Sequence, residues 1–256
     1  MDEILFNRNF MKCPRLGDVM VESDQSRGVI HPPHGKPITG ELITLPKFED
    51  MVNDSYVNLL DIRRSERFFK KENLTGGQLA FLLWSAQGIQ GYRGENDAAV
   101  LKPAPSGGAR HPFEMYAAVS GVDGLKEGLY RYAPTENIGK KIAAVEYLNE
   151  LPNHKNSISA MLAGQKWASR APVVLFLSCV PYRGEWRYAQ AAHRVMLIDL
   201  GHVGQNIMLS AAALGLGSCC IAAYDQKLCD EAFGFDGENE YIVYAAAIGK
   251  VDKKEA

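Results

Sequence analysis

The chain has 256 residues, of which 46% are hydrophobic, so it can bury a full core in one domain or, at most, two small ones. Its formal net charge of −2 gives no overall attraction to nucleic acid or to an anionic membrane, so any anion site must be local. Without a signal-peptide pattern, an apolar stretch of about 18 residues or a CxxC pair among the five cysteines, we expect a cytoplasmic protein with reduced thiols.

The first part of the chain differs in composition from the rest. The stretch GVIHPPHGKPITGELITLPKFED carries four prolines and little periodicity, which predicts an extended arm over residues 1–50, followed by a domain over 51–256. His31 and His34 flank a Pro-Pro pair, but two histidines in a loop are more often solvated than metal-bound.

The domain begins with a predicted helix and a hairpin. In LTGGQLAFLLWSAQGIQG the apolar residues recur on one helical face, and a glycine ends the pattern. The face consists of Leu79, Leu82, Leu83 and Ala86, and the stop is Gly88 or Gly91. Two strands follow, over 114–119 and 129–132, around a turn that contains Asp123 and Gly124. The segment 149–169 is predicted to be helical over its second half.

Three apolar segments form the rest of the predicted core. Residues 171–180 are a continuous apolar run, typical of a central strand buried on both faces. Residues 194–214 predict a long helix that is apolar nearly all round and ends at Gly215 and Gly217, so we expect it to be buried in the domain or between subunits. Residues 241–250 predict the last strand. Because the elements do not alternate as strict βαβ units, the α+β class is favoured.

Several familiar catalytic and binding motifs are absent. GLGSCC is not GxGxxG, and it follows a predicted helix, whereas that fingerprint follows a strand. AAAIGK lacks the first glycine of a phosphate-binding loop, and no GxSxG elbow exists. His193, Asp199 and His202 are spaced by six and three residues, which places them on different faces of one helix, so we predict no metal site.

One segment is rich in positive charge. Arg63, Arg64, Ser65 and Arg67 lie in DIRRSERFF, and arginine suits a phosphate because its planar fork donates paired, charge-assisted hydrogen bonds. The alternative is a solvated charge run at the start of a helix, with Ser65 as its cap.

Two glycine-containing segments are further candidates for binding a flat ring. PAPSGGARHP supplies a hydroxyl and two glycines, Gly107 and Gly108, that would let a ligand approach the backbone, or it is an ordinary surface turn. GLGSC supplies backbone N–H groups at a tight bend, or it only ends the long helix.

The order of these pieces resembles the FMN-dependent nitroreductase superfamily. The similar segments are RRSxRxF, LLWSAQGI, PSGGARHPFEMY, GLYRY, LIDLGHVGQNIMLSAAALGLGSC and a strand ending in GK, from about residue 55 to 251. Within the superfamily the chain looks most like the SagB-type dehydrogenase branch, at PSxG, GLYRY and DxGHxxQN. The resemblance implies an α+β, nitroreductase-like fold with a mixed, mostly antiparallel central sheet flanked by helices, in an intertwined homodimer with FMN at the subunit interface.

The resemblance also implies roles for particular residues. The arginine segment would bind the FMN phosphate, the PSxG segment would approach the flavin from the partner subunit, GLGxC would lie near the isoalloxazine, and a basic residue after the last strand would complete the phosphate site. The cofactor-binding residues implied are Arg63, Arg64, Ser65, Arg67, Pro105, Ser106, Gly107, Gly215, Leu216, Gly217, Ser218 and Lys250.

The chain departs from the SagB-type pattern near the substrate. Enzymes of that branch that oxidise azoline rings carry a Lys-Tyr pair, where this chain has Arg187 and Tyr188. Arginine stays protonated and cannot act as a general base, whereas Tyr188 can donate a proton to substrate or simply pack near the ring. Ala191 stands where the branch often has arginine.

Three functions remain open at this point. The first is an FMN-dependent oxidoreductase that passes hydride by a ping-pong mechanism from NAD(P)H to a nitroaromatic, quinone or similar acceptor. The second is a SagB-type dehydrogenase that oxidises a peptide azoline or another natural product. The third is a flavin-binding protein without turnover.

Overall fold

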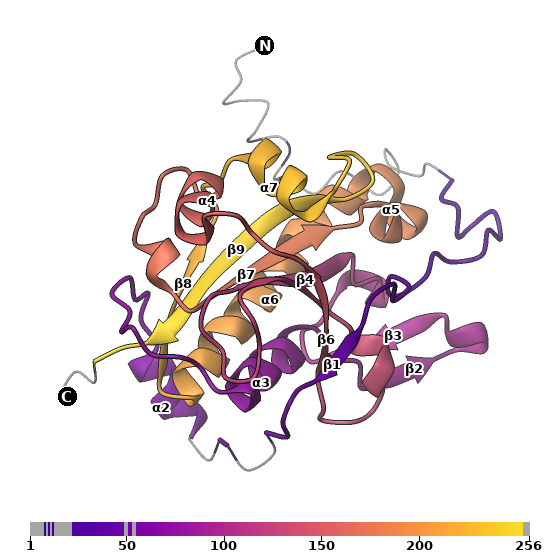
Figure 1. The fold of residues 1–256 in the computed structure, drawn as a ribbon. Coiled ribbons are helices and arrows are strands. Elements are labelled where there is room, and N and C mark those ends of the chain that lie inside the picture. Colours follow the sequence, from indigo (N-terminus) through magenta and orange to yellow (C-terminus); the bar gives the residue numbers. More distant parts are fainter. Residues whose placement is uncertain are drawn as a thin grey trace.

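A seven-stranded antiparallel sheet forms the centre of the computed structural model, which describes residues 8, 10, 12, 22–48, 51, 52 and 55–252 (Figure 1). The strand order is β1-β6-β5-β4-β7-β9-β8, and every pair of neighbours is antiparallel. The strands are β1 (Leu42–Thr44), β4 (Phe113–Val119), β5 (Gly128–Tyr132), β6 (Ala144–Asn149), β7 (Val173–Cys179), β8 (Leu216–Ile221) and β9 (Tyr241–Lys250). A separate hairpin pairs β2 (Gly91–Arg93) with β3 (Ala99–Leu101).

Helices cover both faces of the sheet. On one face lie α3 (Gly76–Gln87) and α6 (Ala192–Ala213), which pack on each other. On the other face lie α4 (His154–Met161) and α7 (Gln226–Phe233) (Figure 1). Two short helices sit at the ends of α6: α5 (Tyr182–Tyr188) precedes it, and α2 (Tyr56–Ile62) contacts it. The predicted α+β fold, with a mostly antiparallel sheet flanked by helices, is confirmed.

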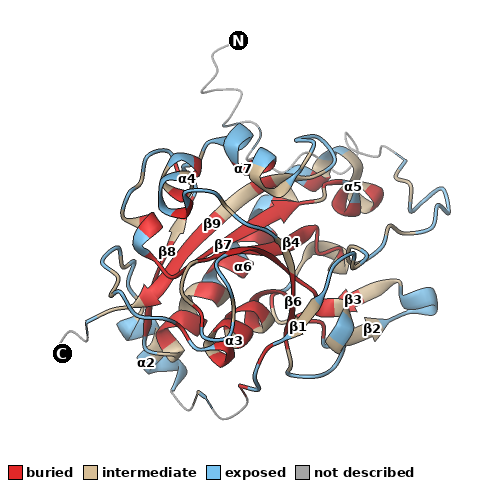
Figure 2. Ribbon diagram, in the orientation of Figure 1, coloured by how far each residue is buried: buried red, intermediate tan, exposed pale blue. Residues whose placement is uncertain are grey.

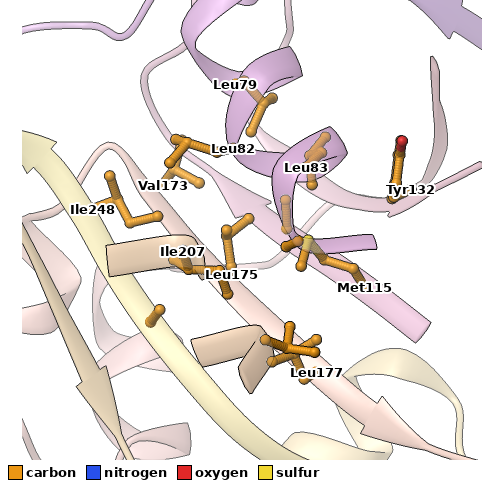
Figure 3. Close-up of a cluster of buried hydrophobic side chains, with 14 of the residues drawn as sticks. Leu79, Leu82, Leu83, Met115, Tyr132, Val173, Leu175, Leu177, Ile207 and Ile248 are labelled. Carbon is orange, nitrogen blue, oxygen red and sulfur yellow. The ribbon is translucent and has the colours of Figure 1, made fainter. Parts of the chain in front are cut away.

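The central strand β7 shows why two faces can be covered. All its residues are buried, and they alternate between two apolar clusters because successive side chains of a strand point to opposite faces. Val173, Leu175 and Leu177 face α3 and α6, whereas Val174 and Phe176 face α4 and α7. Figure 3 shows the first cluster, and Figure 2 shows that the buried residues follow the middle of the sheet and α6.

Helix α3 matches its prediction closely. The predicted face is fully buried, and the helix begins with a capping box in which Thr75 and Gln78 satisfy each other's backbone N–H groups. It ends at Gly88, whose Cβ position would collide with the ring of Trp84. The hairpin strands and the strands β7 and β9 also lie within two residues of their predicted bounds.

Two predictions about local structure are wrong. In the segment 149–169 the helix is α4, which occupies the middle of the segment and not its second half. Gly217 does not end the long helix: α6 stops at Ala213, Gly215 makes the turn with a φ of +67°, and Gly217 already lies inside β8. The six-residue strand β8 was hidden because it follows the helix after two residues, which left no separate apolar run to recognise.

The described part of the predicted arm contributes a strand to the sheet. Strand β1 pairs with β6 and extends the sheet at one edge, and the Leu45 N–H donates to the Ala143 carbonyl at 2.8 Å. The other predicted arm residues, Cys13 among them, lie outside the described residues. The described thiols, Cys179, Cys219, Cys220 and Cys229, are free.

Candidate functional site

A cavity of 520 Å³ lies at the C-terminal end of α6 and brings together residues that are far apart in sequence. Its lining comes from α2 and the arginine segment, the last turns of α6, the first residues of β8 and the chain after β9. The lining residues are Ile62, Arg63, Arg64, Glu66, Met208, Ala212, Ala213, Gly215, Leu216, Ser218, Val251 and Asp252. Five of the predicted cofactor-binding residues therefore surround one cavity, which we call the arginine site.

The cations around this cavity differ in how they are paired. Within the described residues, no hydrogen bond or ion pair engages the guanidinium of Arg63. Arg67 does not line the cavity; its guanidinium stacks over the ring of Trp167, at 5.5 Å from the centroid. Arg64 donates to two nearby backbone carbonyls, those of Asp61 and Arg63. The cavity is thus lined by two guanidinium groups and by the carboxylates of Glu66 and Asp252, and the guanidinium of Arg63 is placed to donate to a phosphate.

Backbone pairing fixes the arginine segment along the edge of the sheet. Ser65 forms a parallel bridge with Ser218, and the Glu66 N–H donates to the Ser218 carbonyl at 2.9 Å. Gly217 sits where this segment crosses β8, and a Cβ there would come within 2.3 Å of Val251 and 2.8 Å of Glu66. The glycine is therefore required by the close approach of two chain segments.

Two predicted details of the arginine site need correction or qualification. GLGSC is not a bend that presents a row of free N–H groups: only Gly215 turns, and the following residues pair with β9. Lys250 does not line the cavity; its ammonium lies 3.2 Å from Glu72, with a side chain 36% exposed, and its carbonyl accepts from the Lys70 N–H.

A second group of predicted residues gathers near the N-terminal end of α6. The Ser106 hydroxyl donates to Asp199 at 2.6 Å, the Gly107 N–H donates to the same carboxylate at 3.0 Å, and the His111 N–H donates to the Ser106 oxygen. Burial raises the pKa of Asp199, while its two hydrogen bonds act in the opposite direction. This carboxylate anchors the loop at 105–111 to α6.

The pair Arg187 and Tyr188 packs against that loop. A Cβ on Gly108, whose φ is +59°, would lie 2.4 Å from Arg187 and 2.8 Å from the Tyr188 hydroxyl oxygen. The loop at 105–111 with Arg187, Tyr188 and Asp199 forms what we call the glycine-loop site. The glycines were expected to let a ligand approach, but on this side it is the chain's own side chains that come close.

The two sites are separate within one chain. Asp199 touches the glycine loop and Ala212 lines the arginine cavity, and these positions are 13 residues apart in α6, or about 20 Å along its axis. The predicted residues therefore fall into two groups, at opposite ends of one helix.

Sequence reasoning missed three contributors to the glycine-loop site. Asp199 was considered only as a metal ligand, although a carboxylate within an apolar helix is itself a signal of a buried polar contact. Arg110 donates to the carbonyls of Gly108 and Ala98, and its guanidinium stacks on Trp186 at 4.9 Å. Lys102 is buried against the Gln87 amide oxygen, and burial lowers its pKa to about 8.

Neither metal-site candidate of the sequence forms a cluster of ligands. His193 lies 2.9 Å from Glu185, and Asp199 is bound to the glycine loop. His31 and His34 stack on each other with centroids 4.7 Å apart. In the part of the chain that the structure describes, no group of three or more His, Cys, Asp or Glu side chains is placed to hold a metal ion. The same part contains no helix that is both long and apolar enough to cross a membrane.

Comparison with known proteins identifies the family. The nitroreductase family model matches residues 60–250, so the chain belongs to the nitroreductase family. A Methanocaldococcus jannaschii protein that carries the name nitroreductase is 32% identical over 187 residues, which cover 73% of this chain and 86% of that protein. A crystal structure of a nitroreductase from Anabaena variabilis superposes with a TM-score of 0.64 and 25% identity, over 83% of this chain and 42% of the other.

A further relative carries a different kind of name. The trifolitoxin-processing protein TfxB of Rhizobium leguminosarum is 33% identical over 118 residues, which cover 45% of this chain and 30% of that protein. The chain thus spans most of the archaeal relative but under half of the Anabaena and Rhizobium proteins.

Proposed function

We propose that the protein is an FMN-dependent oxidoreductase that accepts hydride from NAD(P)H and passes it to a small electron acceptor such as a nitroaromatic or a quinone. The observation that carries this proposal is the guanidinium of Arg63, without an ion pair in the described chain, in the lining of the 520 Å³ cavity of a chain of the nitroreductase family. Bound FMN would supply the redox chemistry, and this explains why no side-chain nucleophile is needed.

The residues of the arginine site fit a phosphate-bearing cofactor. Arg63 has no anionic partner in the described chain and faces the cavity, so a phosphate there would gain a charge-assisted hydrogen bond without breaking an existing pair. Arg67 and Lys250 lie in the neighbouring segments. Arg67 adds positive charge to the same end of the sheet, whereas the ammonium of Lys250 is paired with Glu72. Leu216 and Ser218 line the cavity and would contact the ring system. Ser65 would hold this wall in register through its bridge to Ser218, and Gly217 lets the two segments cross.

A homodimer would bring the two sites together. The exposed face of α6 is partly apolar: Leu197 is 56% exposed and Ile198 is 49% exposed, and Gly201 has open space around its Cβ position. Two copies of α6 that pack antiparallel across a two-fold axis would place the glycine-loop site of one subunit beside the arginine site of the other. An isologous contact of this kind pairs each end with its opposite, so it removes the separation of about 20 Å.

Exposed apolar residues on α2 would widen such an interface. Tyr56, Val57, Leu60 and Ile62 are between 46% and 77% exposed, next to the C-terminal half of α6. Exposed apolar residues gathered on one element are typical of protein interfaces. We propose that Pro105, Ser106 and Gly107 contact the cofactor across this interface, and that Arg187 and Tyr188 meet the acceptor.

An anaerobic absorbance spectrum, recorded before and after addition of NADPH and then NADH, tests this function. We expect a flavin band at about 450 nm that bleaches with at least one nucleotide, because the flavin is the redox group. A protein that shows no band even after incubation with FMN would overturn the proposal. The free thiols fit a cytoplasmic setting, which we propose as well.

A second function is favoured by one specific observation, the similarity to TfxB over 118 residues. In that case the protein would be a dehydrogenase that oxidises a peptide azoline or a related natural product, with oxygen as the acceptor. Turnover of a heterocycle-bearing peptide without any nicotinamide would establish it. A bound flavin that neither nucleotide reduces, in a protein that also fails on such peptides, would instead indicate a flavin-binding protein without turnover.

A further inference from the structure

Residues 24–34 of the arm contact α5 through a set of specific hydrogen bonds. The Gln25 N–H donates to the Trp186 carbonyl at 3.0 Å, and the indole N–H of Trp186 donates to the Val29 carbonyl at 2.9 Å. The Tyr182 hydroxyl donates to Asp24 at 2.7 Å. The arm is therefore bonded near both ends of this seven-residue helix, whose last two residues are Arg187 and Tyr188.

The same stretch of arm also holds the β2–β3 hairpin. His31 Nε2 lies 3.0 Å from the Asn96 carbonyl oxygen, and His34 Nε2–H donates to the Asp97 carbonyl at 2.7 Å. The two histidine rings stack on each other. The ring of His31 also contacts Trp186, and the ring of His34 contacts Tyr92. In Figure 1 the indigo arm runs down the side of the molecule that carries α5 and the hairpin, away from α2.

Backbone strain is concentrated in the segments that meet this stretch. Seven described residues other than glycine have positive φ, and five of them lie in three places: the hairpin turn, the glycine loop and the end of α5. They are Asn96, Asp97, Ala109, His111 and Ala189. Such conformations cost free energy and persist only where surrounding contacts hold them. Ala189, with φ of +45° and ψ of −126°, follows Tyr188 directly.

Trp186 links the arm to the glycine loop. It is 5% exposed, with His31 on one side and the guanidinium of Arg110 on the other. Arg110 in turn donates to the Gly108 carbonyl at 2.8 Å. The arm is thus connected through Trp186 and Arg110 to Gly108, against which Arg187 and Tyr188 lie.

We propose that residues 24–34 are a positioning clasp, which holds Arg187 and Tyr188 on the glycine loop and thereby sets how tightly the electron acceptor binds. The matched family region begins at residue 60, so the clasp is an addition outside it. His31, His34 and Trp186 are the positioning residues. The part that concerns the acceptor rests on the proposed function, whereas the mechanical part does not.

Amide hydrogen exchange on the full chain tests the mechanical part. In His31→Ala/His34→Ala, we expect exchange in α5 and in the glycine loop to be about tenfold faster, because the ring contact of His31 with Trp186 is lost together with the two hydrogen bonds that hold the arm to the hairpin. Exchange in α3 and β7 should be unchanged. The matched control is Thr39→Ala, which removes the 2.9 Å bond from the Thr39 hydroxyl to Glu146, in the same arm but at the sheet edge. Unchanged exchange in α5 would overturn the clasp.

Acceptor kinetics with menadione as the probe test the positioning role. In the double variant and in Trp186→Phe, we expect KM for menadione to rise about tenfold while flavin content stays constant, because these changes leave the arginine site and the bonds from Asp199 to Ser106 and Gly107 in place. The variant His34→Gln keeps an N–H donor for the Asp97 carbonyl, so it should retain most of the affinity for menadione that the double alanine variant loses.

The outcomes separate the clasp from the proposed function. Faster exchange with an unchanged KM would reduce the clasp to a structural strap and overturn the positioning role. Absence of flavin, or of bleaching, in the unmodified protein would instead contradict the proposed function, while the exchange measurement would still decide the clasp.

Discussion

The two ends of α6 carry opposite kinds of polar chemistry. At the N-terminal end the buried carboxylate of Asp199 is satisfied by groups of its own chain, Ser106 and Gly107, and the loop is complete by itself. At the C-terminal end Arg63 has no anionic partner in the described chain and lines a cavity of 520 Å³. One end is an assembled scaffold, and the other is a site prepared for an anion.

This difference suggests that the two ends have different roles in the proposed function. The arginine site would bind the cofactor, and the glycine-loop site would shape the surroundings in which the acceptor reacts. In the proposed dimer a partner copy of α6 would bring these two ends together. The following changes test this contrast.

Disruption of the proposed dimer should have the largest effect. Leu197→Glu would bury a carboxylate in the apolar α6 contact, which costs several kcal/mol and should weaken self-association and FMN binding by at least about 100-fold. Sedimentation velocity with detection at the flavin band measures both. The control is Leu228→Glu, since Leu228 is 39% exposed but lies on α7. A monomer that keeps stoichiometric flavin would contradict the shared site.

Removal of the unpaired arginines should come next. Arg63→Ala and Arg67→Ala each take a charged donor from the phosphate, and such hydrogen bonds contribute about 1.5–3 kcal/mol, so FMN should bind about 10- to 150-fold more weakly in each variant. Dialysis followed by absorbance measures the retained flavin. Arg93→Ala, at an exposed position in β2, serves as the matched control. Full retention of flavin by the double arginine variant would refute the phosphate assignment.

Two glycines with positive φ allow a direct comparison of the two ends. Gly108→Ala and Gly215→Ala should each lower the free energy of unfolding by about 1–2 kcal/mol, because alanine is strained in the left-handed region. A Cβ on Gly215 meets open space, whereas one on Gly108 displaces Arg187 and Tyr188. Only Gly108→Ala should therefore raise KM for the acceptor. Chemical unfolding and steady-state kinetics check the pair, and equal kinetics in both variants would argue against a role for Arg187 and Tyr188.

The pH dependence of stability should reveal the buried histidine of the glycine loop. Burial and the nearby Lys102 lower the pKa of His111 to about 3, from the usual 6.5. The unfolded chain then binds a proton that the folded chain does not, so stability is full above pH 6.5 and falls as the pH drops toward 3. Between about pH 7 and 5.5 this amounts to about 1 kcal/mol.

Replacement of that histidine should remove this part of the pH dependence. His111→Gln keeps a donor for the Val100 carbonyl and should flatten the curve measured by urea unfolding at the two pH values. His193→Gln is the control, since that side chain is 48% exposed. An unchanged slope in His111→Gln would show that the imidazole is not neutral in the folded state.

The sequence by itself determined the elements whose signal is local. The continuous apolar run of β7, the 3.6-residue periodicity of α3 and the glycine that ends it are local patterns, so the helix, the strand and the α+β class followed from them. The charge of the arginine segment was also local, and it pointed to an anion site before any neighbour was known.

Tertiary structure alone decided which distant segments meet. No local sequence pattern predicts that Ser65 pairs with Ser218 or that another segment crosses over Gly217. The same holds for the bond between the arm and Trp186, because each of these contacts joins residues far apart in the chain. The separation of the predicted site residues into two groups has the same origin. A motif indicates which groups a segment can bind, whereas the length and direction of α6 decide where in the structure that segment lies.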